Sequence, residues 1–220
     1  MKKKALRKTT LPNPAIQMDF LAAQKLVRSY GIPIVPMHKA KSERDIMIIA
    51  KKLPFPWALK ATGKRLIHKT DVGGVRLGIT NTHDAMRTLH ELKKIRECEY
   101  VVIQPMREGI ELIVGGKMDP QFGPTVLVGM GGIYTEVFKD SSVRIAPITE
   151  TDAKEMIREL TIFPILEGTR GKKGVDEKQL IRLLMGVSKL MVERNVKELD
   201  LNPVLATPER VEAVDVRIIN

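Results

Sequence analysis

A histidine and two glycines lie close together in the segment IHKTDVGGV. The neutral imidazole of His68 can act as a nucleophile toward phosphorus. Gly73 and Gly74 have no Cβ, so they can turn backbone N–H groups toward an anion. Lys60, at the end of the preceding apolar stretch, and Lys69 each add a point charge that suits a phosphate. The segment indicates phosphate chemistry, although a glycine pair after a polar run is also typical of a plain hairpin turn.

Oxygen-bearing side chains alternate with leucines near the C-terminus. In a strand, period-two geometry puts Glu198, Asp200 and Asn202 on one face. Asp215 lies between two valines in the next expected strand, where an ionised group needs a cation or hydrogen bonds. Carboxylate and amide oxygens are ligands that Mg²⁺ takes together with nucleotide phosphates. A solvated face of an edge strand explains the same alternation, so the pattern alone leaves both interpretations open.

Strands and helices alternate in the first half of the chain. Apolar spacing and capping signals predict helices that begin at Asn13-Pro14, at Ser42 with Asp45 as a capping box, and at Thr82. Short β-prone runs predict strands over Ile32–Met37, Trp57–Lys60 and Arg76–Ile79.

The second half contains more strands in close succession. The expected strands are Tyr100–Met106, Ile110–Val114, Thr125–Val128, Ser142–Ile148, Glu198–Leu205 and Val211–Ile219, and the expected helices are Asp152–Leu160 and Asp176–Glu193. Antiparallel strands with packed helices predict an α+β fold.

Composition narrows the class of protein. Lys and Arg number 37 against 26 Asp and Glu, a formal charge of +11, and residues 1–14 form a basic tail that we expect to be flexible. No RNP, zinc or helix-turn-helix signature accompanies the tail, so a nucleic-acid partner is not expected. No apolar run approaches the ~20 residues that cross a bilayer. No secretory h-region follows the first lysines, and Cys98 is the single cysteine, so the expected location is the cytoplasm.

Three further segments follow His68 in a fixed order: QPM with ELIVGG, DPQFGP with GMGGIYTE, and ELDLNPV with an aspartate beyond it. Together they resemble the ATP-grasp β subunit of an ADP-forming acyl-CoA synthetase (acetate–CoA ligase, ADP-forming), a relative of the succinyl-CoA synthetase β subunit. The resemblance covers nearly the whole chain, from about Ile16 to Ile218. It implies an ATP-grasp domain over residues 15–220 with two α/β lobes, about 15–103 and 104–220, and ATP or ADP between them.

The resemblance implies an adenine site at the strand that links the lobes. Its backbone would pair with the adenine edge, and Ile103 and Met106 would sandwich the ring, although both are equally typical of a plain core. Gln104 stands where the succinyl-CoA branch has Glu. Glu111 matches the position that holds the ribose hydroxyls, since a carboxylate accepts two hydrogen bonds.

The resemblance also implies the phosphate and metal sites. Asn202 and Asp215 match the Mg²⁺-ligand positions. Asp200 replaces the Glu of the wider ATP-grasp group and would reach the metal through water. Arg144 would neutralise the charge of the transferring phosphoryl group, or it is a surface strand residue, and Arg170 is a weaker candidate for the same contact.

The implied activity requires a second chain. Acyl-CoA and phosphate would give an acyl phosphate, a histidine of a CoA-binding α subunit would take the phosphoryl group, and His68 would relay it to ADP. The expected assembly is an α2β2 heterotetramer. Two alternatives stay open: a non-catalytic, nucleotide-sensing regulatory subunit, and a stand-alone ATP-grasp carboxylate–amine ligase, which needs no histidine carrier.

Overall fold

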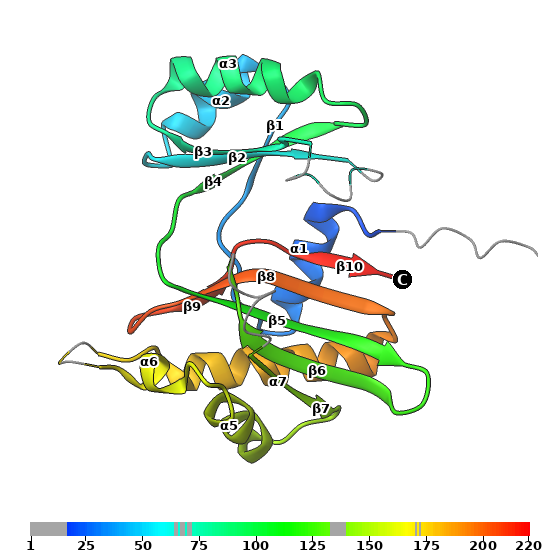
Figure 1. Cartoon of the computed structure of the whole chain (residues 1–220). Coiled ribbons are helices and arrows are strands. Elements are labelled where there is room, and N and C mark those ends of the chain that lie inside the picture. The colour runs from blue at the N-terminus through cyan, green and yellow to red at the C-terminus, as the bar shows by residue number, and fades with distance from the viewer. Residues whose placement is uncertain are drawn as a thin grey trace, which may run out of the picture.

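The computed structural model describes residues 17–63, 66, 69, 72–132, 140–169, 171 and 173–220. This part of the chain forms two antiparallel sheets that lie one above the other (Figure 1). Helices α2 and α3 (Glu43–Ala50 and Thr82–Lys93) cover the first sheet, and the long helix α7 (Glu177–Arg194) covers the second, each on the side away from the other sheet. The predicted α+β class is confirmed.

The first sheet has the strand order β1-β4-β2-β3, and all its neighbouring strands are antiparallel. Its strands are β1 (His38–Ala40), β2 (Trp57–Thr62), β3 (Val75–Ile79) and β4 (Tyr100–Pro105). Alternate residues of β2 point to opposite sides: Trp57, Leu59 and Ala61 pack against the helices, whereas Lys60 lines the space between the sheets.

The second sheet has the order β10-β8-β5-β6-β7, and β9 also pairs with β8. Its strands are β5 (Ile110–Asp119), β6 (Gly123–Met130), β7 (Ser141–Ile145), β8 (Glu198–Ala206), β9 (Val211–Ala213) and β10 (Arg217–Ile219). Leucines of α7 pack on one face of this sheet, and α5 (Glu150–Arg158) and α6 (Phe163–Glu167) lie beside them.

The capping box predicted at Ser42 and Asp45 is confirmed, since each side chain accepts a backbone N–H of the other residue. The expected helix start at Asn13-Pro14 lies outside the described residues, and residues 17–19 are not helical. Helix α1 spans Phe20–Ser29 and is capped by Asp19, whose Oδ1 accepts the N–H groups of Leu21 and Ala22. The preceding Gln17 makes a β-bridge instead.

Two strand predictions also differ from the structure. Residues 32–37 form no strand, and only Ile34 makes an isolated bridge, to Ala213. The strand expected over 211–219 is two strands, β9 and β10, because residues 214–216 leave the ladder on β8.

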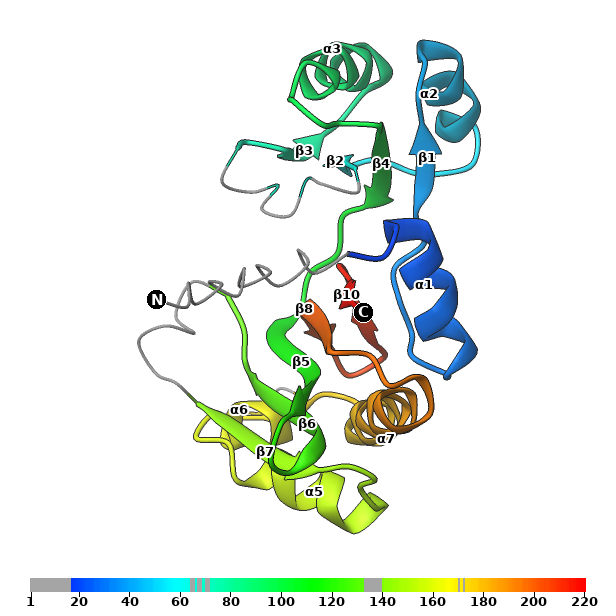
Figure 2. The same ribbon diagram turned by 90° about the vertical axis from the view of Figure 1, so that its right-hand side faces the viewer.

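Helix α1 packs with the second sheet although it precedes the first one in the chain. Phe20, Ala23 and Val27 belong to the same apolar core as α7 and β8. Figure 2 shows α1 beside β10. The N-terminal segment therefore joins the two layers, and Asp19 accepts a 2.8 Å hydrogen bond from the hydroxyl of Tyr100 on β4. Among the described residues no helix is long and apolar enough to cross a membrane.

Candidate functional site

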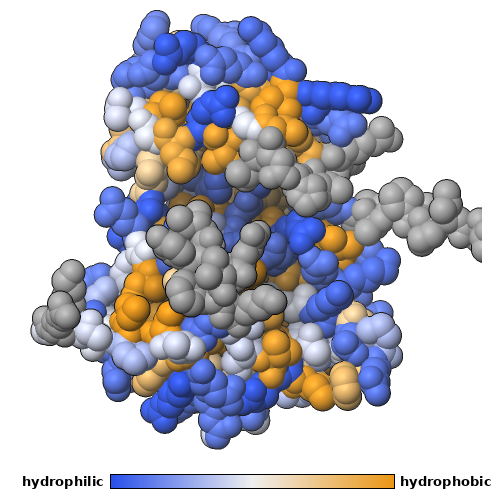
Figure 3. Space-filling model, viewed as in Figure 1, coloured by the Kyte–Doolittle hydropathy of each residue, from blue (hydrophilic) through white to orange (hydrophobic). Residues whose placement is uncertain are grey.

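A cavity of about 260 Å³ lies between the two sheets. It is lined from above by β2, β3 and β4 and from below by β5, β8 and the β9–β10 connection. Figure 3 shows hydrophilic side chains in the hollow between the lobes. Six residues singled out from the sequence line the cavity: Lys60, Gln104, Met106, Glu111, Asn202 and Asp215.

Part of the cavity wall is apolar and includes Ala58, Val75, Met106 and Leu205. Gln104 also lines the cavity and is almost fully buried. Its Nε2 donates to the carbonyl of Val214 at 2.9 Å, and its Oε1 has no partner among the described residues. Because a carbonyl only accepts, this bond fixes which way the amide faces. The apolar walls suit a flat ring, whereas this oxygen is itself buried.

Ile103 does not line this cavity, so its predicted contact with a nucleotide base is corrected. Its side chain is fully buried in the first lobe, in the core formed with Ile46, Leu59 and Leu89. Both faces of β4 are covered, and alternation sends Ile103 to the helices and Gln104 to the cavity.

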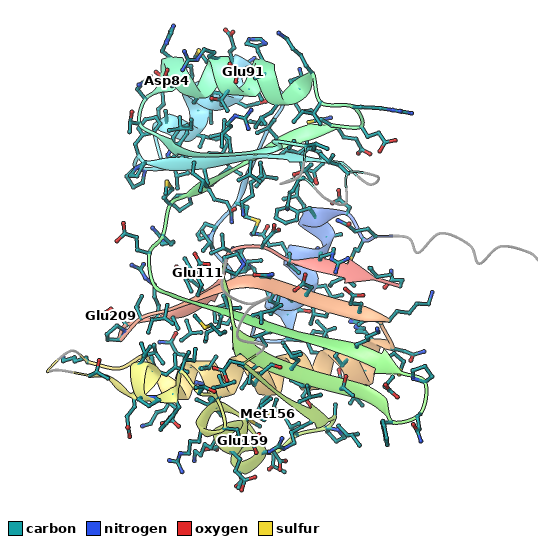
Figure 4. The ribbon with its side chains drawn as sticks, in the orientation of Figure 1. Asp84, Glu91, Glu111, Met156, Glu159 and Glu209 are labelled. Atoms are coloured by element: carbon teal, nitrogen blue, oxygen red, sulfur yellow. The ribbon has the colours of Figure 1, made fainter. Side chains whose placement is uncertain are left out.

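Glu111 lies at the start of β5 with an exposed side chain (Figure 4). A Cβ on Gly132 would approach its Oε2 to 2.7 Å, and Gly132 has φ +78°. The N–H of Gly131 donates to the Glu111 carbonyl at 2.8 Å. The two glycines therefore let the chain pass close to this carboxylate, which still faces the cavity.

Lys60 places a buried ammonium group in the wall of the cavity. Its Nζ donates to the Val214 carbonyl at 3.1 Å, and its side chain is only slightly accessible. Burial lowers the pKa of Lys60 to about 8, although the charge of Asp215 opposes this shift and that of Lys69 adds to it. Among the described residues, the Val214 carbonyl is the hydrogen-bond partner of this buried ammonium, so an anion bound in the cavity would stabilise its charge further.

Asn202 and Asp215 lie opposite each other. The register pairs Val204 with Ala213 and Asp200 with Arg217, so counting two residues inward from either pair aligns Asn202 with Asp215. Both line the cavity. Their amide and carboxylate oxygens fit a Mg²⁺ ion that takes its remaining ligands from phosphates and water. No group of three or more His, Cys, Asp or Glu side chains that could hold a metal occurs among the described residues.

A bulge in β8 at Asn202 and Pro203 shifts the alternation of the strand, so that beyond it Leu205 lines the cavity and Val204 packs in the core. β5 places one residue, Ile113, between the pairs Leu112–Val204 and Val114–Leu201, whereas β8 places Asn202 and Pro203 there. Such an extra residue re-aims side chains and is frequent beside functional sites.

Asp200 stands on the same face of β8 but is engaged by Arg217, with 3.7 Å between Oδ2 and the guanidinium. Arg217 also pairs with Glu198. Burial raises the pKa of Asp200, and the Arg217 charge opposes this shift. The predicted alternation of Glu198, Asp200 and Asn202 against buried Leu199 and Leu201 is confirmed.

Lys69 forms an ion pair with Asp215, 146 residues further along the chain. Its Nζ lies 2.9 Å from Oδ1 and 2.7 Å from Oδ2, and 4.5 Å from the centre of the Phe20 ring. Sequence reasoning missed this pairing and missed Phe20, because neither is visible in local patterns.

The glycine pair forms a turn that closes on Lys69. Gly73 has φ +65°, and the N–H of Gly74 donates to the Lys69 carbonyl. A Cβ on Gly74 would lie 2.6 Å from that carbonyl oxygen. The N–H of Gly74 is therefore used within the loop, which corrects the expectation that it faces an anion.

Arg144 lies on the opposite face of the second sheet, which corrects its predicted role at the phosphates. It forms an ion pair with Glu159 at the end of α5 and donates to Ser142 at 3.3 Å. Figure 4 shows Glu159 on the far side of the sheet from Glu111. The alternation of residues in β7 predicts that the strand has two different faces, but it does not predict which face packs against the helices.

His68 and Arg170 lie outside the described residues, as do residues 1–14 of the basic tail. Lys69, the next residue along the chain, is described and pairs with Asp215 of the cavity wall.

Two other lining groups were not foreseen. The Val214 carbonyl accepts hydrogen bonds from both Lys60 and Gln104. This role belongs to the backbone, so the residue type at position 214 gives no indication of it. Arg107 lines the cavity and pairs with Glu212 at 3.1 Å. Its position directly after Met106 could have identified it.

Comparison with known proteins gives consistent matches. A family model described as an ATP-grasp domain matches residues 14–219. The chain is 38% identical, over 90% of its length and 89% of the relative's, to the β subunit of acetate–CoA ligase [ADP-forming] I from Pyrococcus furiosus. It is 40% identical to acetate–CoA ligase [ADP-forming] I from Archaeoglobus fulgidus, of which it spans 30%.

Solved structures agree with these matches. An acetyl-coenzyme A synthetase from Ca. Korarchaeum cryptofilum, in complex with coenzyme A and Ca-AMPCP, superposes with a TM-score of 0.86 at 36% identity, covering 93% of both chains. The same enzyme with Mg-AMPPCP and its phosphohistidine segment pointing towards the nucleotide binding site gives 0.80 at 35% identity, over 92% of both chains.

Proposed function

Because this chain belongs to the ATP-grasp family and, within it, groups with the β subunits of ADP-forming acetate–CoA ligases, we propose that it is the nucleotide-binding, phosphoryl-transferring subunit of an ADP-forming acyl-CoA synthetase. The observation that carries the proposal is the single cavity that gathers Lys60, Glu111, Asn202 and Asp215 from both sheets. Acetyl-CoA is the first substrate to test.

The proposed arrangement of ADP follows the polarity of the cavity. The adenine ring lies against the apolar wall beside Met106. The ribose hydroxyls donate to Glu111. The phosphates meet Lys60, and Asn202 and Asp215 hold Mg²⁺ there, which when bound neutralises phosphate charge.

The proposed chemistry is a phosphoryl relay that passes through His68. One P–N bond, to a histidine of the α subunit, breaks as one to His68 forms. The P–N bond to His68 then breaks as a terminal phosphate oxygen of ADP attacks, and ATP results. Lys60 holds the acceptor phosphate in line, which is most of what catalysis of this transfer needs.

The proposed partner is a CoA-binding α subunit in an α2β2 assembly. The chain spans most of a relative named as a β subunit and under a third of relatives such as the Archaeoglobus enzyme. The additional length of the latter is consistent with an acyl-CoA half carried on the same chain.

The proposal is tested by replacing His68 in the presence of the α subunit, acyl-CoA, labelled phosphate and ADP. His68→Asn should leave ADP binding and labelling of the α subunit intact but remove label from this chain and abolish ATP formation. His83→Asn, an exposed histidine on α3, is the matched control and should behave as wild type. Normal ATP formation by His68→Asn would show that phosphate passes directly from the partner to the nucleotide. A chain that binds ADP but takes no label in any form would instead support a nucleotide-sensing subunit.

A further inference from the structure

Two lysine ammonium groups lie near Asp215. The Lys69 ammonium contacts both of its carboxylate oxygens, at 2.9 and 2.7 Å. The Lys60 ammonium lies against the carbonyl of the preceding residue, Val214. The predicted metal ligand therefore carries a lysine in the position that a cation would take.

The position of Lys69 is set by three separate parts of the fold. Its side chain contacts Asp215 in the β9–β10 connection and the ring of Phe20 in α1. Its carbonyl accepts the N–H of Gly74, and no side chain fits at Gly74 because a Cβ would lie 2.6 Å from that oxygen. Both ion-pair partners are largely shielded from solvent, with side-chain exposures of 18% and 21%. The pair is a built feature rather than an incidental surface contact.

This arrangement opposes binding of a divalent cation by itself. The cation would have to displace Lys69 from at least one carboxylate oxygen, and it would meet two nearby ammonium groups. A nucleoside diphosphate changes the balance, because its phosphate oxygens offer both lysines new partners while they supply further ligands to the metal.

We propose that Lys69 serves as the counter-cation of Asp215 in the nucleotide-free protein and yields this position to the divalent cation only when the nucleotide phosphates are present. Lys69 is thus a positioning residue that sets the binding order: the metal enters with the nucleotide or after it. This inference rests on the proposed nucleotide site.

The test measures Mn²⁺ binding to the full chain without nucleotide, by electron paramagnetic resonance of the free ion and by calorimetry. Wild type should bind Mn²⁺ weakly, and Lys69→Met should bind it about tenfold tighter or more, as removal of a unit charge a few ångströms away requires. Lys69→Gln should reproduce the gain in Mn²⁺ affinity, and Lys69→Arg should not. When Asp215→Asn is added to Lys69→Met, the gain in Mn²⁺ affinity should disappear.

The matched control is Lys154→Met, which breaks the 2.8 Å pair with Glu150 on α5 and changes the net charge equally. It should leave Mn²⁺ affinity unchanged. If both neutral variants, confirmed as folded by their thermal transitions, bind Mn²⁺ no better than wild type, the inference is overturned. Strong Mn²⁺ binding by the wild-type chain in the absence of nucleotide also overturns the inference. Failure of the wild-type chain to bind ADP in the presence of Mn²⁺ would contradict the proposed nucleotide site itself. That measurement is independent of the titration without nucleotide, so the two failures can be distinguished.

Discussion

Asn202 lies opposite Asp215 across a gap in the ladder between β8 and its two short partners, β9 and β10. The gap arises where Asn202 and Pro203 form a bulge and residues 214–216 leave the sheet. Two oxygen-bearing side chains thus face one cavity at a point where neither is needed to pair strands.

Asp215→Ala should abolish the Mg²⁺-dependent part of ADP binding, because it removes the one carboxylate of the proposed metal pair. Calorimetry of ADP with and without Mg²⁺ measures the difference directly. Asp84→Ala, on α3 far from the cavity, is the matched control. An unchanged Mg²⁺ increment in Asp215→Ala would falsify the metal assignment.

Glu111→Ala should weaken ADP binding by roughly 1.5–3 kcal/mol, the range for a hydrogen bond to a charged group. The exposed Glu108, three residues earlier, provides the control Glu108→Ala, which should bind ADP normally. Affinity for inorganic phosphate should stay the same in Glu111→Ala. An equal loss for phosphate would show that the substitution damaged the fold rather than a ribose contact.

Lys60→Met should stabilise the fold while it weakens ADP binding. The pKa of Lys60 falls from 10.5 to about 8, and at about 1.4 kcal/mol per unit this places the penalty of its buried charge at roughly 3 kcal/mol, an upper limit to the gain. The Val214 carbonyl keeps its bond from Gln104 in the variant. Urea unfolding at pH 7, with the exposed Lys52→Met as control, measures the gain.

The same lysine predicts a pH dependence with a definite sign. Below pH 8 both the folded and the unfolded chain hold the proton, so the full penalty applies. Between pH 8 and 10.5 only the unfolded chain keeps it, so the free energy of unfolding contributed by Lys60 rises with pH. The advantage of Lys60→Met over wild type should therefore shrink across this range. An advantage that is constant with pH contradicts the assignment.

Arg144→Ala should leave ADP affinity and ATP formation unchanged, since Arg144 faces α5 and not the cavity. The loss of its partly exposed pair with Glu159 should lower stability by at most about 1 kcal/mol. Steady-state ATP formation with the α subunit is the measurement. A fall of about a hundredfold in turnover without loss of stability would instead support the prediction that Arg144 acts on the transferring phosphate.

The sequence by itself determined the local features, because these depend on neighbours in the chain. The Ser42 and Asp45 capping box needs two side chains three residues apart. The strand from Glu198 shows its two faces through simple alternation, which the structure confirms up to Asn202. The ordered motifs also sufficed to identify the family.

Only the tertiary structure decided which face of a strand meets the cavity and which distant groups meet there. Ile103 and Gln104 are both buried, and alternation alone cannot assign one to a core and the other to a site. The bulge at Asn202 depends on the register with β5, and the ion pair of Lys69 with Asp215 joins residues 146 apart. Such contacts arise from the packing of two sheets and α1 against each other, and packing is a property of the whole chain rather than of any segment.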